Sequence, residues 1–540
     1  MRQTRQKLAH ATMDTVLACF TCFALFLSLH LITILIFSKK EGKAKLPPSP
    51  PSLPFIGHLH HLKKPLHHSL ARLSARHGPI LLLKLGRRRA LVVSSACLAE
   101  ECFTTNDHAF SNRPHLPSSS INSYNHTIFP FANYGTAWRD MRRVAVAEIL
   151  AAHRLPYFSD VRTEEVRFLA RTLFRQHSAS ASEEAGFQRV ELRQMLFGVA
   201  LNVMMRTMVG KRYFGEEKED GVAQRFMELV AELLSVTGAS NVGDFLPAPV
   251  GWLALLGIRR KLKKLQGYRD AFMQAIVEEH RIRKARAVEG RKEAGEEIEE
   301  SNNSGKQKTL FEAMLSLQKE QPELYTDLYI KSLLLGLLSG GTDTISNTME
   351  WTMSLLLNNP ENLEKAREEI MEKVGEKRLV EESDLNNLPY LHCIIQETLR
   401  MYPAGPVIPH ESMQECKVGG YVIPPRTILL VNAYAIQRDP KIWPDGSKFL
   451  PERFLHDSNL QFVRTMLPFG KGRRGCPGEG LAMREMELTL GTLLQCFEWR
   501  RIGAEKVGME EGSGLSLPKA KPLKALFKPR ESMLNVLCLL

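Results

Sequence analysis

A lone cysteine stands among glycines and arginines in the stretch Phe469-Gly470-Lys471-Gly472-Arg473-Arg474-Gly475-Cys476-Pro477-Gly478. A helix-like stretch follows from Glu479, and the backbone N–H groups at a helix start favour a thiolate. Glycines let the backbone approach a flat cofactor closely, and arginine suits a carboxylate. These features favour a cysteine thiolate that faces a cofactor. The alternative is a glycine-rich turn around a buried cysteine.

The stretch resembles the haem loop of cytochromes P450, Phe-x-x-Gly-x-Arg-x-Cys-x-Gly, and matches it at Phe469, Gly472, Arg474, Cys476 and Gly478. Five fixed positions recur by chance in roughly one chain in several thousand. The resemblance implies haem b (iron protoporphyrin IX) with Cys476 as its metal ligand, and with Phe469 and Arg474 beside the cofactor. A thiolate ligand donates electron density to iron and favours O–O cleavage.

A second motif, Gly340-Gly341-Thr342-Asp343-Thr344, lies inside a long apolar stretch at residues 333–357. Glycines cost a helix about 1 kcal/mol each relative to alanine, and an acid beside an alcohol in apolar surroundings needs a reason. The motif is similar to the distal-helix motif of cytochromes P450. That similarity implies room for dioxygen, with Asp343 and Thr344 delivering protons. Ile345 departs from the family's hydroxyl residue, and a plain packing site is the alternative.

Two further matches concern the haem propionates. Trp138-Arg139-Asp140-Met141-Arg142 resembles a family helix that reaches them, and Trp138 and Arg142 share a helical face at this spacing. An amphipathic basic helix is the alternative. His410 matches a plant P450 position that hydrogen-bonds a propionate, although a lone histidine is often satisfied without any ligand.

A third set of charged residues has a structural role in the family. Glu397 and Arg400 lie three apart, and Arg453 follows in Pro451-Glu452-Arg453-Phe454, upstream of the cysteine loop. The resemblance implies a buried charge network among the three.

Composition narrows the partners and the compartment. The chain has 540 residues, a net charge of +13 and a pI of about 9.2. Such a charge fits an anionic membrane surface or an acidic protein, and the absence of any nucleic-acid motif argues against nucleic acid. Nine cysteines with a single CxxC pair, Cys19 and Cys22, do not suggest a disulfide scaffold. We therefore expect a reducing compartment.

The N-terminus predicts a membrane anchor. Residues 16–37 carry no charged side chain, which is long enough for a transmembrane helix. The run ends in Ser38-Lys39-Lys40 rather than in a small-residue cleavage site, so an uncleaved anchor is favoured over a signal peptide. The positive-inside rule weakly places the body in the cytosol. With the resemblance, this indicates a single-pass protein of the endoplasmic reticulum membrane.

Helical patterns dominate the rest of the chain. We predict helices at 333–357, 361–374 and 391–401 and strands at 80–85, 90–93, 420–423 and 427–431. The charged stretch 278–308 predicts a helix tail that runs into a surface loop. The fold class is mainly α with small β-sheets, the cytochrome P450 fold, plus one transmembrane helix. The predicted parts are an N-terminal extension at 1–15, an anchor at 16–37, a basic and proline-rich linker at 38–54, a catalytic domain at 55–530 and a C-terminal tail at 531–540.

The resemblance is finest to plant microsomal cytochromes P450 of the isoflavone hydroxylase type, family 81, on Leu46-Pro47-Pro48-Ser49-Pro50, residues 70–79 and Cys496-Phe497-Glu498-Trp499. It implies a monooxygenase that receives electrons from NADPH through NADPH–cytochrome P450 reductase. The implied substrate is hydrophobic, an isoflavonoid or another phenylpropanoid-like metabolite, bound by stretches 108–134, 334–344 and 404–409. The alternatives are a haem-thiolate isomerase or dehydratase that needs no reductase, and a non-catalytic haem-binding relative.

Overall fold

The computed structural model describes residues 45–179, 186–215, 241–247, 249–293, 309–455, 464–512, 514 and 516–540, together with Thr21, Ser28 and Glu228. Apart from Thr21 and Ser28, the predicted extension, anchor and first part of the linker lie outside these residues. Within the described part of the chain, no helix is both long enough and apolar enough to cross a membrane.

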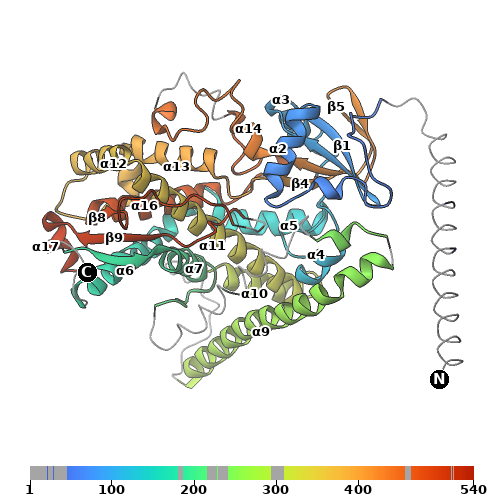
Figure 1. The fold of residues 1–540 in the computed structure, drawn as a ribbon. Helices are drawn as coiled ribbons and strands as arrows, with labels where there is room; N and C mark the ends of the chain where they lie inside the picture. The colour runs from blue at the N-terminus through green and yellow to red at the C-terminus, as the bar shows by residue number, and fades with distance from the viewer. Residues whose placement is uncertain are drawn as a thin grey trace, which may run out of the picture.

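Helices make up most of the described chain (Figure 1). The longer ones are α2 (Leu66–His77), α5 (Thr136–Ala145), α6 (Ser159–Ala179), α7 (Leu192–Val209), α9 (Val250–Glu293), α10 (Leu310–Glu320), α11 (Asp327–Asn358), α12 (Pro360–Lys373), α13 (Pro389–Met401) and α16 (Glu479–Cys496). The shorter ones are α3 (Ala96–Phe103), α4 (Pro117–Asn122), α14 (Ala433–Ile436) and α17 (Leu534–Leu537).

Helix α11 runs through the middle of the molecule. The hydroxyl of Thr326 caps its start by accepting from the backbone N–H of Tyr329 at 3.2 Å. The helix ends at Asn358 because Pro360 begins the next helix, α12. Most of its side chains are buried, and its apolar residues join two core clusters that also contain residues of α7. Hydrophobic burial on several faces explains why the sequence is apolar without a clear stripe.

Three small sheets complete the fold. The largest joins β1 (Ile80–Leu85), β2 (Arg88–Val93), β7 (Ile428–Val431) and β4 (Ile408–Glu411) in that order, with β2 and β7 parallel and the other pairs antiparallel. The second joins β3 (Gln188–Glu191), β9 (Lys524–Pro529) and β8 (Phe497–Arg500), and the third pairs β5 (Cys416–Val418) with β6 (Tyr421–Ile423). The sheet of β1 lies at one end of the molecule, away from β8 and β9 (Figure 1).

This architecture confirms the prediction of a mainly helical protein with small sheets. The predicted helix at 333–357 is part of α11, which begins six residues earlier, at Asp327. The hairpin at 80–93 and the strand at 427–431 are present as β1, β2 and β7. The helix tail predicted from residue 278 continues as α9 to Glu293, and residues 294–308 lie outside the described chain.

Two terminal segments pack on the body more closely than their composition suggests. The carbonyl of Pro48 accepts from the backbone N–H of Leu82 at 2.8 Å, so this part of the proline-rich linker lies on β1. At the other end, Met533 and Leu537 of the C-terminal tail are almost fully buried. The carbonyl of Leu540 accepts from Arg171 on α6 at 3.1 Å. The tail therefore belongs to the hydrophobic core.

The expected charge network of Glu397, Arg400 and Arg453 is present. The guanidinium of Arg400 donates to both carboxylate oxygens of Glu397, at 2.7 and 2.9 Å, and Arg453 donates to one of them at 3.1 Å. Glu397 and Arg400 are completely buried. Arg400 also donates to backbone carbonyls, including that of Gln437 at 2.8 Å. A buried ion pair satisfied in this way fixes α13 against the segment that leads to the cysteine loop.

Candidate functional site

The cysteine loop is a tight turn that ends where α16 begins. The backbone N–H of Cys476 donates to the carbonyl of Phe469 at 2.8 Å, which closes the loop. Gly472 has a φ of +69°, and an added Cβ there would lie 2.4 Å from the carboxylate of Asp107. Only glycine fits at that position. Gly472 therefore allows close contact with Asp107, and the approach of the loop glycines to a cofactor stays a prediction.

Cys476 lies directly before α16 and is an exposed residue. Burial among the surrounding groups raises its pKa, while the backbone N–H of Gly478 and the charge of Arg142 act in the opposite direction. The backbone N–H groups at the helix start thus lower the pKa of Cys476 as predicted, but by less than burial raises it. A thiolate here becomes favourable when a cation binds the sulfur.

Helix α5 reaches the cysteine loop through Arg142. Its guanidinium donates to the carbonyl of Gly475 at 2.9 Å. Trp138 lies one turn earlier on α5 and is buried. The guanidinium carbons of Arg474 and Arg142 lie 4.4 and 5.7 Å from the centre of its ring, within the range of cation–π attraction. The structure thus brings Trp138, Arg142 and Arg474 together, and their contact with haem propionates stays a prediction.

Arg474 is the buried arginine of the loop. Its Nε donates to the carbonyl of Ser111 at 2.7 Å and its Nη2 to that of Ala132. Its Nη1 is buried without a hydrogen-bond partner in the described chain. Burial, with Arg113 and Arg142 close by, lowers the pKa of Arg474 to about 8. The neighbouring Arg473 is exposed and pairs instead with Asp107 at 3.0 Å.

Arg113 belongs to the same cluster and was not singled out from the sequence. It donates to the carbonyls of Pro130 (3.2 Å) and Pro409, and burial lowers its pKa to about 10. No local pattern marks it, because its neighbours come from other segments. The only feature of the sequence that pointed to Arg113 was its position in stretch 108–134, which was expected to bind substrate.

His410 lies on β4 and is buried. Its Nδ1 lies 2.6 Å from the carbonyl of Phe110, so the neutral ring carries its proton on Nδ1 and donates it there. Burial and the charges of Arg113 and Arg474 lower its pKa well below the ordinary value. His410 is therefore neutral, and its Nε2, which has no hydrogen-bond partner in the described part of the chain, can accept a proton when an anion lies near.

The acid and alcohol of the second motif lie on α11 and make their own contacts. Asp343 is buried and accepts from the amide of Asn347 at 3.0 Å. Burial raises its pKa to about 6, against a hydrogen bond from Ser516 and the charge of Arg193. The hydroxyl of Thr344 donates to the carbonyl of Gly340 at 2.5 Å. Asn347 lies one turn after Asp343, so its helical spacing could have identified it.

The two glycines of this motif differ in their surroundings. An added Cβ at Gly340 would meet nothing within 4 Å, whereas one at Gly341 would lie 2.6 Å from the sulfur of Met204. Gly340 alone leaves open space, and Gly341 lets α11 approach α7 closely. The similarity had implied open space at both positions.

The residues around Cys476 suit haem. Within the described chain, no carboxylate pairs with Arg113, Arg142 or Arg474, whose side-chain hydrogen bonds go to backbone carbonyls. A buried positive cluster of this kind needs an anion. Haem propionates are carboxylates, and an accessible cysteine sulfur is a soft ligand for iron. The unpartnered Nη1 of Arg474 is a further donor for the same group.

Comparisons with known proteins agree with this geometry. The family model described as Cytochrome P450 matches residues 47–527. The protein named Cytochrome P450 81Q32 from Catharanthus roseus is 46% identical over 507 residues, which are 94% of this chain and 96% of that protein. Isoflavone 2'-hydroxylase from Glycyrrhiza echinata is 40% identical, with 95% of this chain and 98% of its own length covered. A zebra fish cytochrome P450 solved with progesterone has a TM-score of 0.71 at 25% identity, and covers 87% of this chain and 100% of its own.

The fold, the matches and the basic cluster beside an accessible cysteine define a haem-containing oxidoreductase. The chain belongs to the cytochrome P450 family, and it is a monooxygenase related to plant hydroxylases and synthases that include members of family 81.

Proposed function

We propose that this monooxygenase inserts one oxygen atom from O2 into a hydrophobic aromatic plant metabolite, an isoflavonoid or another phenylpropanoid-like compound. The electrons come from NADPH through NADPH–cytochrome P450 reductase. The observation that carries the proposal is the accessible Cys476 before α16, beside three arginines that no carboxylate pairs with in the described chain. Relatives supply the substrate class: they are named isoflavone 2'-hydroxylase, isoflavone 3'-hydroxylase and (+)-piperitol/(+)-sesamin synthase.

The haem would be held by residues from three separate segments: the cysteine loop, α5 and β4. Cys476 would supply the thiolate ligand, and Phe469 would lie beside it in the same loop. Arg142, Arg474 and His410 would bind the propionates, with Trp138 packed under both guanidinium groups. When bound, haem supplies the activation of dioxygen.

Asp343 and Thr344 on α11 would deliver protons to the site. A carboxyl group with a pKa of about 6 gains and loses a proton readily near neutral pH, so Asp343 is suited to pass protons inward. The hydroxyl of Thr344 uses its hydrogen on Gly340, which leaves its oxygen able to accept from a water. Asn347 and Ser516 position the carboxyl group.

Two of the three stretches expected to bind substrate contact one another. An added Cβ at Gly336 would lie 2.8 Å from Pro130 and 3.3 Å from Phe129, and the hydroxyls of Thr127 and Ser332 lie 3.1 Å apart. Stretch 108–134 therefore packs directly on the first half of α11. The many apolar side chains of both support a hydrophobic substrate.

We also propose that the enzyme is anchored in the endoplasmic reticulum membrane by residues 16–37, with its catalytic domain in the cytosol. The uncharged run and the lysines that follow it support this proposal. The net charge of +13 fits both an anionic membrane surface and an acidic reductase surface.

The function is tested with the full-length protein in membranes, plant reductase, NADPH and a panel of isoflavones and lignans under isotopically labelled O2. We expect a product that carries one labelled oxygen atom and forms only with reductase. An unlabelled product that forms without reductase would establish the isomerase or dehydratase alternative. Absence of turnover across the panel, together with normal spectral shifts on substrate binding, would support a non-catalytic protein.

A further inference from the structure

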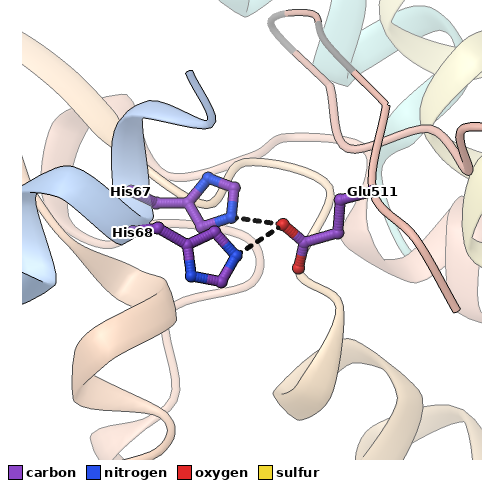
Figure 2. A group of neighbouring side chains, drawn as sticks. All are labelled: His67, His68 and Glu511. Carbon is purple, nitrogen blue, oxygen red and sulfur yellow. Dashed lines mark hydrogen bonds and ion pairs between the residues drawn. The ribbon is translucent and has the colours of Figure 1, made fainter. Parts of the chain in front are cut away.

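A cluster of metal-ligating side chains lies outside the haem site. The Nε2 atoms of His67 and His68 lie 2.7 and 2.9 Å from the same carboxylate oxygen of Glu511 (Figure 2). His67 and His68 stand in the first turn of α2, and Glu511 comes from the loop between β8 and β9. One ligand atom from each residue lies within 4.8 Å of the other two.

Packing holds the two imidazole rings in this arrangement. The ring of Tyr434 lies 4.6 Å from that of His67 and 4.7 Å from that of His68, centre to centre. His67 is buried, and the carboxylate of Glu511 is 10% exposed. The side chain of His68 is 39% exposed, which leaves a route from solvent. The ligand atoms are thus oriented before any ion arrives, and this reduces the entropy lost on binding.

We propose that His67, His68 and Glu511 bind Zn²⁺ or a comparable divalent transition-metal ion. Two imidazole nitrogens and one carboxylate oxygen are ligands that zinc uses at about 2.0–2.2 Å. Ligands at that distance around a tetrahedral ion lie roughly 3.3 Å apart. The two nitrogen–oxygen separations therefore need to open by about half an ångström. A small shift of the Glu511 carboxylate oxygen, which both separations share, opens them together. Water from the solvent side completes the fourth position.

Binding replaces the two N–H···O hydrogen bonds. The Nε2 proton that each ring donates to Glu511 moves to Nδ1 by exchange with solvent, and the freed Nε2 coordinates the ion. Arg438 adds an opposing positive charge, because its guanidinium carbon lies 3.8 Å from the ring centre of Tyr434 and its charge interacts with Glu511. The ion is therefore held reversibly.

The site has a consequence for the loop that carries Glu511. The same loop provides the carbonyl of Leu517, which accepts from the indole of Trp351 on α11 at 2.7 Å, and Ser516, which bonds Asp343. An ion bound at Glu511 ties this loop to α2. We therefore expect the ion to stabilise the folded protein by mass action.

The experiment is a titration of the full-length haem-containing protein with Zn²⁺ in buffer free of chelators. Wild type should bind a saturable equivalent that His68→Ala and Glu511→Gln each weaken by at least about tenfold. His60→Ala and His77→Ala are matched controls, since both residues are exposed histidines near or within α2; neither change should alter the affinity. X-ray absorption of the zinc-loaded wild type should show two imidazole ligands, which tests the site even if a variant folds poorly.

Two results would overturn the proposal. Wild type without saturable binding would mean that Glu511 is only a hydrogen-bonded link between α2 and its loop. Binding that is lost in His60→Ala or His77→Ala, and kept in His68→Ala, would place the ion on exposed histidines elsewhere.

Discussion

Arg142 on α5 donates a hydrogen bond of 2.9 Å to the carbonyl of Gly475, the residue directly before Cys476. The two partners are 333 residues apart in the chain. The bond joins the helix proposed to reach the propionates to the loop proposed to ligate iron. Together with the stacking of Arg474 on Trp138, this contact fixes the helix and the loop relative to each other.

Arg474 should matter for haem retention, and its neighbour Arg473 should not. Arg474→Ala removes a buried cation, and hydrogen bonds to charged groups contribute about 1.5–3 kcal/mol. Haem affinity should therefore fall about tenfold or more. Arg473→Ala removes an exposed ion pair with Asp107 and an exposed hydrogen bond to the Tyr134 hydroxyl, and it serves as the control. The measurement is the rate of haem transfer to an apoprotein acceptor, and equal rates for the two variants would contradict the assignment.

Asp343 should destabilise the fold at neutral pH. Its pKa of about 6 in the folded state exceeds the ordinary 3.8. The protonated carboxyl group therefore stabilises the folded state fully below pH 3.8, and this stabilisation is lost as the pH rises through 6. The ionised group then costs up to about 3 kcal/mol. Asp343→Asn should raise the unfolding temperature at pH 7.5 and raise it less at pH 5, while it slows turnover.

Asp327 at the start of α11 provides a control of opposite sign. The hydrogen bond from Arg281 lowers the pKa of Asp327. The ionised carboxylate therefore stabilises the folded state above its ordinary pKa, and this stabilisation is lost as the pH falls. Asp327→Asn should lower the unfolding temperature at pH 7.5. The same response in both variants would contradict the burial argument for Asp343.

Thr344→Ala should keep haem and substrate binding but uncouple NADPH consumption from product. The hydroxyl is proposed to hold a water that delivers protons, and its loss should increase the hydrogen peroxide released per NADPH. Serine should restore much of the coupling, and valine should not, although its shape is closer. Thr342→Val is the control, because that buried hydroxyl bonds only the carbonyl of Leu338 in the described chain. Equal coupling in wild type, Ala and Val would make Thr344 a packing residue.

Deletion of residues 1–44 should release most of the protein from membranes and preserve haem binding. The cut falls before Lys45, whose carbonyl accepts from the backbone N–H of Val422 at 2.9 Å, so the segment that packs on the body is kept. Fractionation of membranes and a haem spectrum measure the two outcomes. Loss of haem would show that the anchor supports the fold, and full membrane retention would require a second apolar surface.

The sequence predicted features that depend on local pattern. The apolar run of α11, the turn-flanked strands β1 and β2, and the spacing of Trp138 and Arg142 all follow from helix and strand periodicity. The resemblance added Glu397 with its two arginines, whose contacts cross the chain. These predictions hold because each depends on the spacing or the order of residues along the chain, which can be read from the sequence.

Other features depend on tertiary contacts that no local pattern encodes. Arg113 joins the basic cluster only because Pro130 and Pro409 supply carbonyls from distant segments. Ser516 reaches Asp343 from a loop more than 170 residues later in the chain. Gly341 fits a methionine of α7, although its motif had implied open space. Such pairings are set when helices pack, so the sequence did not reveal them.

The most direct test of the account is the absorption spectrum of the reduced, carbon monoxide-bound protein. With Cys476 as the thiolate ligand, wild type should absorb at about 450 nm. Cys476→Ala should lose that band, because the loop from Phe469 to Gly478 contains no other cysteine. Retention of the band in Cys476→Ala would contradict the assignment of the iron ligand, and with it the proposed site.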